Sequence, residues 1–411
     1  MNAISIPLDS ARVKTFDPGS AANERRRIES VDLLRGLIMI IMALDHTRDF
    51  FSNATFSPTD LDNTTVEYFF TRWITHFCAP VFFLLTGTGA YLSLRRKSKR
   101  ELSRFLFTRG LWLIFLDTVV LRCLSVQFNF DFHVTMLTVL WALGWAMMVL
   151  SVLVYLPDAA VIAFGVILIV GHNLFDSIDG SSFGAFAPLW YILHSLNFVI
   201  NTPKHAVLVS YTLIPWVGVT AAGYGLGGVF SWTPERRKAF LLCLGLGLIA
   251  AFVVLRAVNI YGDPVPWSVQ KSAVFTVLSF LNTNKYPPSL LFLLMTLGPA
   301  LLFLRAVDSR TPQFLRPAVV YGKVPLFYYA VHFTVIHLLA VIVCYACYGH
   351  IHWMFESPTL AQFPFTRPPG WGFNLPGVYL VWAFVVISLY PLCRWFAALK
   401  QRRSDAWLSY L

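Results

Sequence analysis

The chain has 411 residues, of which 57% are hydrophobic and only 13% are charged. A soluble domain carries about 25% charged residues, and it has too little interior to hide this much apolar surface from water. The composition therefore excludes a soluble enzyme, a disordered chain and a nucleic-acid-binding domain. The net charge of +11 is typical of a membrane protein whose cytoplasmic loops are basic.

Apolar stretches recur along the chain at the length of roughly 20 residues that a helix needs to cross the hydrocarbon core. They predict an all-α integral membrane protein, a polytopic bundle of about ten transmembrane helices within residues 27–400. Residues 1–26 are expected to be a flexible cytoplasmic tail and residues 401–411 a C-terminal tail. The predicted spans are 31–51, 66–93, 105–126, 133–154, 158–174, 206–230, 239–258, 286–306, 324–347 and 377–399.

The distribution of Lys and Arg predicts how these helices are oriented. With the N-terminus inside, the inner segments carry 21 Lys and Arg residues and the outer segments carry four. Cytoplasmic loops hold the excess of basic residues, so both termini are expected to be cytoplasmic. Three long segments, at about 175–205, 259–285 and 348–376, then lie outside, where they either pack over a site or simply cap the bundle.

The first span ends in the densest polar cluster of the chain, Asp45-His46-Thr47-Arg48-Asp49. Asp45 and Arg48 are three residues apart, as are His46 and Asp49, so each pair can meet on a helix face. A carboxylate beside an imidazole fixes the ring and strengthens it as a base. The alternative is a helix end whose charges reach the interface, with Asp45 and Arg48 as a simple ion pair.

Further polar residues are expected to converge on the same outer side from other spans. These are Arg72, His76, Lys285, Tyr286 and His332. Ionisable groups within a membrane are costly and usually mark a site, although a membrane histidine can also serve only in helix packing. His332 and His337 are five residues apart and should point to different faces. No Cys, His or carboxylate set has the spacing of a metal site, so no metal is predicted.

Several segments resemble a known family. Arg27-Ile-Glu-Ser30-Val-Asp32-Leu-Leu-Arg35-Gly36 resembles the R-x-x-S-x-D-x-x-R-G opening of transmembrane acyltransferases, in particular the heparan-α-glucosaminide N-acetyltransferase-like proteins and their bacterial relatives. Similar segments are Ala43–Phe51, His76–Pro80 with the run to Gly87, Lys285–Ser289, and Gly322–Tyr329 with the run to His337. The resemblance covers most of the chain.

The resemblance implies a membrane-bound acyltransferase that moves an acyl group, expected to be acetyl, from cytosolic acyl-CoA to a sugar or glycan acceptor on the outer face. His46 stands where the family has a catalytic Asn, and no His occurs between His46 and His76 to match the family's catalytic His. We therefore expect His46 to act as general base or as nucleophile. In a bacterium, the protein would lie in the inner membrane. The sequence leaves a monomer and a homodimer open.

Roles for the other candidate residues follow from this interpretation. The expected catalytic set is His46, Asp49 and Asp45. The expected acceptor-binding set is Arg48, Arg72, His76, Lys285, Tyr286 and His332. The expected set for binding acyl-CoA is Arg35, Asp32 and Lys323. Two other functions remain open, a transporter or proton-coupled permease that uses the same intramembrane charges and a membrane scaffold without activity.

Overall fold

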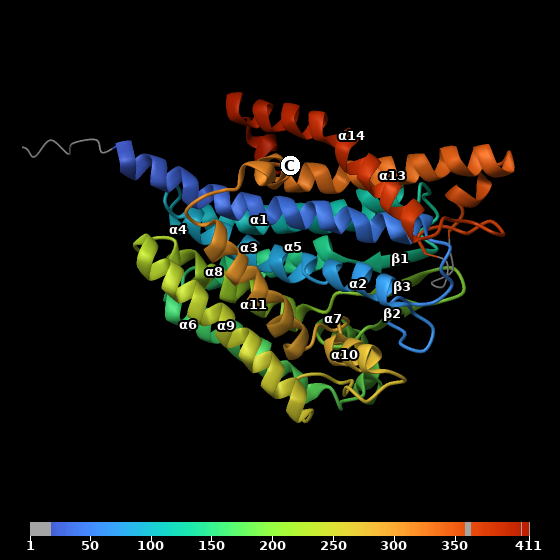
Figure 1. The fold of residues 1–411 in the computed structure, drawn as a ribbon, viewed down its shortest axis with the longest axis horizontal. Helices are drawn as coiled ribbons and strands as arrows, with labels where there is room; N and C mark the ends of the chain where they lie inside the picture. The colour runs from blue at the N-terminus through green and yellow to red at the C-terminus, as the bar shows by residue number, and fades with distance from the viewer. Residues whose placement is uncertain (1–17, 358–362, 404, 411) are drawn as a thin grey trace, which may run out of the picture.

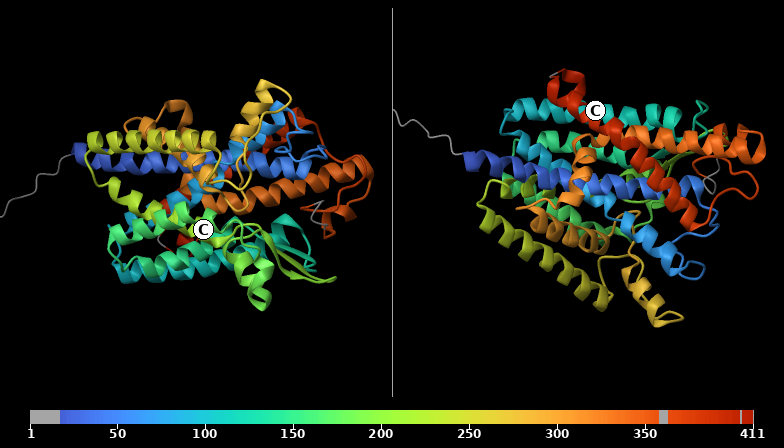
Figure 2. Two further views of the ribbon diagram at one scale, coloured as in Figure 1. Left: turned by 90° about the horizontal axis from the view of Figure 1, so that it is seen from below. Right: turned by 45° about the horizontal axis from the view of Figure 1, so that its top comes forward.

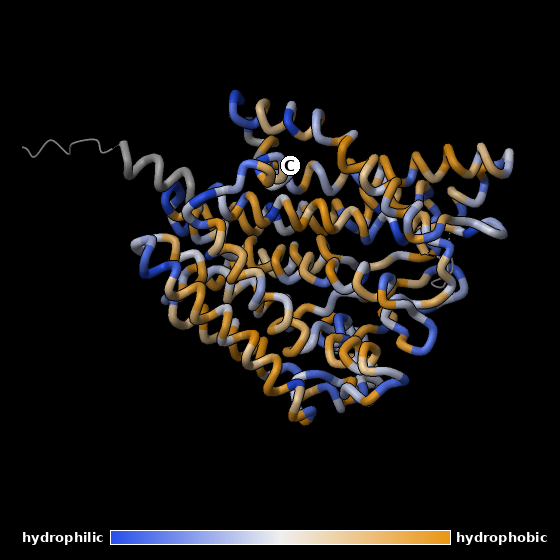
Figure 3. The backbone as a smooth tube through the Cα atoms, in the orientation of Figure 1, coloured by the Kyte–Doolittle hydropathy of each residue, from blue (hydrophilic) through white to orange (hydrophobic). Residues whose placement is uncertain are grey.

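The computed structural model describes residues 18–357, 363–403 and 405–410. Long helices run side by side as a bundle in which α1 (Pro18–Phe51) lies near the middle (Figure 1). The predicted N-terminal tail falls mostly outside the described residues, since α1 begins at Pro18. Figure 3 shows hydrophilic residues gathered in the connecting loops and toward the helix ends, as expected for helices that lie within a membrane.

The other helices of the bundle follow α1 and are joined by shorter elements. The longer helices are α2 (Val66–Thr75), α3 (Cys78–Ser93), α4 (Lys99–Phe115), α5 (Val139–Leu153), α6 (Asp158–Gly171), α8 (Leu213–Val229), α9 (Pro234–Val258), α11 (Leu290–Val307), α13 (Pro325–Tyr348) and α14 (Leu375–Arg402). Three shorter helices are α7 (Ala187–Leu193), α10 (Ala273–Leu281) and α12 (Arg316–Lys323). A π-helical segment, Leu116–Val126, continues α4. Short 3-10 segments occupy residues 172–175, 180–186, 313–315, 352–355 and 406–409.

Six stretches of the described chain are long and apolar enough to cross a membrane. They are Val66–Ser93, Asp158–Phe175, α9, α11, α13 and α14. The predicted stretches 31–51, 105–126, 133–154 and 206–230 also become mainly helical, as α1, α4 with its π continuation, α5 and α8. The prediction of an all-α membrane protein is thus confirmed in its architecture.

A small sheet forms a local exception to the helical fold. Its strands are β1 (Val134–Leu137), β2 (Asn197–Asn201) and β3 (Ala206–Val209), in the order β1-β3-β2. β1 pairs parallel with β3, whereas β2 pairs antiparallel with β3. The predicted spans 133–154 and 206–230 are wrong at their starts because each begins with one of these strands. A short apolar run suits a strand and a helix equally well.

The two ends of the bundle differ in the segments that connect the helices. We name the end with the sheet and the long segments 176–212 and 259–289 the loop end. The opposite end, with the short connections 94–98 and 230–233 and the segment 308–324, is the basic end. The views in Figure 2 show the sheet and the long connections gathered away from the N-terminal end of α1.

Two glycines explain how α1 crosses α12. A Cβ atom on Gly36 would lie 1.8 Å from the carbonyl oxygen of Ala318, and one on Gly322 would lie 1.7 Å from that of Asp32. Only glycine permits backbones to approach this closely. Both glycines belong to the segments that resemble the acyltransferase family, so these two distant motifs meet at one helix crossing.

Candidate active site between two cavities

A polar cavity of about 290 Å³ opens at the loop end. The end of α1 supplies Asp45, His46, Arg48 and Asp49 to its wall, α2 supplies Arg72, and the segment before α11 supplies Lys285 and Tyr286. The sheet, the π-helical segment and α13 close the remaining sides. Seven of the predicted site residues, which come from three separate segments, therefore line one cavity.

Asp45 joins α1 to α2 through a buried ion network. Its carboxylate lies 2.8 Å from Nη2 of Arg48 and accepts a hydrogen bond of 2.6 Å from Nη1 of Arg72, which also contacts its second oxygen. The predicted pair of Asp45 and Arg48 is confirmed. Charge-assisted hydrogen bonds of this kind are about twice as strong as neutral ones, so Asp45 fixes the end of α1 against α2.

The predicted contact of His46 with Asp49 is wrong. The Asp49 carboxylate instead accepts a hydrogen bond of 2.7 Å from Nη2 of Arg48, and the His46 ring lies against α13, with its centroid 4.1 Å from that of Phe333. An arginine has a longer reach than an imidazole and captures the neighbouring carboxylate. In the described structure, His46 is therefore packed among rings and does not contact the Asp49 carboxylate.

His332 is the polar neighbour that His46 gains in place of Asp49. The two ring centroids are 5.3 Å apart, and His332 is fully buried. Nδ1 of His332 lies 2.9 Å from the carbonyl oxygen of Tyr328. A carbonyl oxygen only accepts, so Nδ1 carries the proton. Nε2 is then an acceptor, and it has no partner among the described residues.

The loop-end cavity also holds cationic side chains whose hydrogen-bonding groups are not all used within the described residues. Lys285 is only 8% exposed, and its ammonium lies 5.2 Å from the centroid of the Tyr286 ring, with no ion pair to a described carboxylate. Nη1 of Arg48 is buried and lacks a hydrogen-bond partner within the described part of the chain. Buried charges are costly unless they are paired, so this cavity is suited to an anionic or strongly polar ligand.

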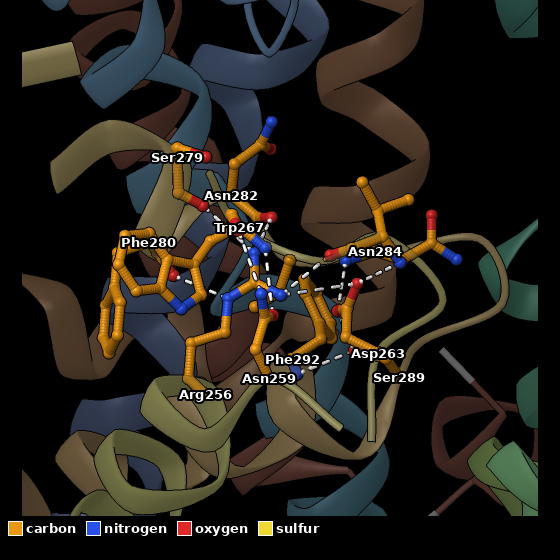
Figure 4. A network of polar contacts seen from close by, with 12 residues as sticks. Arg256, Asn259, Asp263, Trp267, Ser279, Phe280, Asn282, Asn284, Ser289 and Phe292 are labelled. Atoms are coloured by element: carbon orange, nitrogen blue, oxygen red, sulfur yellow. Dashed lines mark hydrogen bonds and ion pairs between the residues drawn. The ribbon is translucent and has the colours of Figure 1, made fainter. Parts of the chain in front are cut away.

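The segment that carries Lys285 is held by a buried arginine of α9. Figure 4 shows the Arg256 guanidinium among the backbone carbonyls of the loop. It donates hydrogen bonds of 2.8–3.0 Å to four of them, those of Val265, Ser279, Phe280 and Asn282. Asp263 lies 3.7 Å from Nη1 of Arg256.

Asp263 continues this network to the start of α11. Its carboxylate accepts hydrogen bonds from the backbone N–H of Asn284 at 2.9 Å and from the hydroxyl of Ser289 at 2.6 Å. Burial raises the pKa of Asp263, and these hydrogen bonds oppose that rise. The chain is thus fixed on either side of Lys285 and Tyr286, which orients both side chains toward the cavity. Arg256 lies near the end of the predicted span 239–258, and its contacts with this loop come from the tertiary structure.

A second cavity, of about 300 Å³, opens at the basic end. Four cationic residues from four helices line it, namely Arg35, Arg109, Lys323 and Lys400. Arg35 and Lys323 were predicted to bind acyl-CoA. Asp32 does not line the cavity, but it accepts a hydrogen bond of 2.9 Å from Arg35. Arg109 and Lys400 were not among the predicted binding residues, because only the packing of α4 and α14 brings them here.

The two cavities share a wall inside the bundle. Val139 and Tyr329 line both of them, and the Tyr329 ring centroid lies 6.3 Å from that of His46. Sequence reasoning assigned no role to Tyr329, although its position three residues before His332 places both on one helix face. Tyr329 therefore stands between the two cavities, beside His46.

Other predicted histidines lie apart from this junction. His76 is buried at the break between α2 and α3, with its ring 5.3 Å from that of Phe292, and it does not line the loop-end cavity. His337 faces the carbonyl oxygens of Ser125 and Met354, so the prediction that His332 and His337 face different ways is confirmed. Among the described residues, no group of three His, Cys, Asp or Glu could hold a metal ion.

These features define an integral membrane protein with two cavities, one at each end of the bundle, that are each lined by several charged residues. The model of the heparan-α-glucosaminide N-acetyltransferase catalytic family matches residues 27–261, more than half of the chain. The protein belongs to this family, as the resemblance of its segments predicted, and the family is one of acetyltransferases. No curated protein sequence matches the chain.

Proposed function

We propose that the protein transfers an acetyl group from acetyl-CoA at the basic end to a sugar or glycan acceptor at the loop end. The observation that carries this proposal is that Tyr329 and Val139 line both cavities, with His46 on the loop-end side. One cavity is basic and the other contains a candidate base. A reaction between two substrates that enter from opposite ends requires such a junction.

The basic cavity fits the phosphates of acetyl-CoA. Arginine and lysine are the usual ligands of phosphate groups, and Arg35, Arg109, Lys323 and Lys400 all line this cavity. Arg35 also donates a hydrogen bond of 3.1 Å to the carbonyl of Gly322, which fixes it beside Lys323. In the bound complex, these residues would hold the nucleotide so that the acetyl thioester points toward Tyr329.

The proposed topology has ten spans, with the basic end and both termini in the cytoplasm. The Lys and Arg bias of 21 to four supports this orientation. The helices α1, α4, α5 and α8 would be spans in addition to the six apolar stretches, since each runs beside them in the bundle. In a bacterium, the acceptor would then be a cell-envelope glycan at the outer face of the inner membrane.

His46 would act as the general base. The acceptor amine or hydroxyl attacks the thioester carbonyl and gives its proton to His46 as the new N–C or O–C bond forms. The C–S bond then breaks, and the CoA sulfur takes the proton from His46. Nε2 of His332, which lacks a donor in the described structure, would accept a hydrogen bond from the other ring nitrogen of His46 and so orient it.

The cations of the loop-end cavity would bind the acceptor. Lys285 has no carboxylate partner among the described residues, and Nη1 of Arg48 has no described hydrogen-bond partner, so a polar acceptor such as a sugar can pair with them. Arg72 is bound to Asp45, so we propose that it positions α1 and does not contact the acceptor. An acyl-histidine intermediate on His46 is the alternative mechanism.

Acetyl transfer by the reconstituted full-length protein tests this proposal. The assay supplies acetyl-CoA with a labelled acetyl group and a panel of amino sugars and envelope glycans. His46→Ala should lower kcat by about 10²–10⁴-fold, the usual contribution of a general base, with acetyl-CoA binding retained. The exposed His352 provides a matched control, and His352→Ala should leave the rate unchanged.

Two results would overturn different parts of the proposal, the role of His46 and the reaction itself. Full activity of His46→Ala would keep the reaction but remove His46 from it. Uptake of free sugar by proteoliposomes without loss of acetyl-CoA would instead favour a transporter, since two cavities that open at opposite ends also suit alternating access.

A further inference from the structure

A third cavity, larger than the two already described, lies away from the proposed reaction. It is a groove of about 740 Å³ that shares no lining residue with either polar cavity. Its walls come mainly from two helix pairs, α6 with α8 and α9 with α11. Each pair is packed tightly at a glycine, Gly165 on α6 and Gly245 on α9. The space between the two tight pairs forms the groove.

The groove is apolar along most of its length and faces the hydrocarbon region. Leu244 and Leu248 of α9 and Ile162 and Val166 of α6 are typical of its walls. Only 22% of the apolar window of α6 and of α9 is buried inside the protein, so both helices are open to their surroundings. In a membrane, the groove therefore opens to lipid chains and not to water.

The polar residues of the groove are confined to its basic end. Tyr91, Asp158, Ser231 and Trp232 line it there, and each lies at or beside the end of a helix. The Tyr91 hydroxyl is 3.3 Å from the Asp158 carboxylate. A groove with a long apolar body and one polar end has the same division of chemistry as a phospholipid, whose acyl chain is apolar and whose headgroup is polar.

Two exposed arginines make the mouth of the groove positive. The Arg236 guanidinium lies 4.3 Å from the centroid of the Trp232 ring, which lines the groove. Nη2 of Arg95 is 3.5 Å from the carbonyl oxygen of Phe230, one residue before Ser231. Asp158 is the one carboxylate among the described residues that line the groove. Basic residues at a membrane interface attract anionic lipids.

We propose that this groove binds one acyl chain of an anionic phospholipid, whose phosphate lies at Arg95 and Arg236. The proposal does not depend on the acetyl-transfer reaction, because the groove and the two polar cavities have separate walls. The bound lipid would fill the space between the α6–α8 and α9–α11 pairs and so join the two halves of this side of the bundle.

Native mass spectrometry of the delipidated full-length protein tests the proposal. The protein is titrated with phosphatidylglycerol and, separately, with phosphatidylcholine of the same acyl chains. We expect one phosphatidylglycerol to bind at least tenfold more tightly than phosphatidylcholine. Leu248→Trp, which fills the groove, should abolish this binding. Leu246→Trp is the matched control, because Leu246 lies on the same helix, is 51% exposed and does not line the groove.

A second variant keeps the test decisive if Leu248→Trp does not fold. Arg95→Gln with Arg236→Gln changes only exposed side chains, and it should bring the two lipids to within about twofold of each other. Equal binding of both lipids by the wild-type protein would overturn the proposal. So would binding that Leu248→Trp leaves unchanged, or a dimer that Leu248→Trp disrupts in the absence of lipid, since a second copy would then occupy the groove.

Discussion

Replacing Asp45 by Asn should destabilise the protein strongly, because it removes a buried negative charge. The Asn side chain has nearly the same size and shape as Asp, so the effect reports the charge alone. The side chains of Asp45, Arg48 and Arg72 are only 12%, 8% and 15% exposed. In Asp45→Asn, Arg72 loses its carboxylate partner, whereas Arg48 keeps Asp49. Breaking one partner from a buried ion pair costs about 3–5 kcal/mol. We expect a value near the lower limit of that range, because the network borders a polar cavity.

The free energy of unfolding can be measured by reversible denaturation in mixed micelles. Asp49→Asn is the matched control on the same helix, since the Asp49 side chain is 42% exposed and an exposed pair contributes at most about 1 kcal/mol. Combining Asp45→Asn with Arg72→Gln should restore part of the loss, because the unpaired charge of Arg72 is then removed. If Asp45→Asn stayed within about 1 kcal/mol of wild type, this network would not be what holds α1 to α2.

Four further predictions concern His332 beside His46, the crossing of α1 and α12, the cavity at the basic end, and the loop that carries Lys285. His332→Phe should lower kcat roughly tenfold at unchanged KM for acetyl-CoA, and His332→Gln should recover part of it; an equal loss in both variants would contradict a hydrogen bond to His46. Gly322→Val should reduce stability by at least about 1–3 kcal/mol in thermal unfolding, and a fully stable variant would exclude the tight crossing with α1. Lys323→Glu should raise the KM for acetyl-CoA about tenfold, whereas Arg316→Glu on the same helix, outside the cavity, should not. Arg256→Met should speed hydrogen exchange in residues 279–289 by about 100-fold, as expected for a local loss of about 3 kcal/mol; unchanged exchange would show that other contacts hold this loop.

The sequence alone predicted the features that depend on neighbours along the chain. The length of the apolar stretches predicted the helices, because a span must bury its own backbone polar groups in one continuous helix. The pair of Asp45 and Arg48 also depends only on local sequence, because residues three apart can meet on one face of a helix. The strands β1 and β3 were missed because their apolar residues run directly into α5 and α8.

The site depended on contacts between distant segments. Asp49 could be paired with His46 from spacing, but its real partner is Arg48, and the neighbour that His46 gains is His332 on α13, far along the chain. Lys400 could be counted as a basic residue near the end of the chain, yet it faces the same cavity as Arg35. Local spacing therefore could not predict which of these residues meet.

Tertiary structure thus decided which of the predicted polar residues act together. Apolar length and charge bias are properties of single segments, so the sequence determined the helices and the family motifs. The direction of each side chain depends on how its helix is rotated and tilted against its neighbours, and that is set by packing at points such as the Gly36–Gly322 crossing. For this reason only the assembled bundle brings His332 and Tyr329 beside His46, close to the wall that the two cavities share.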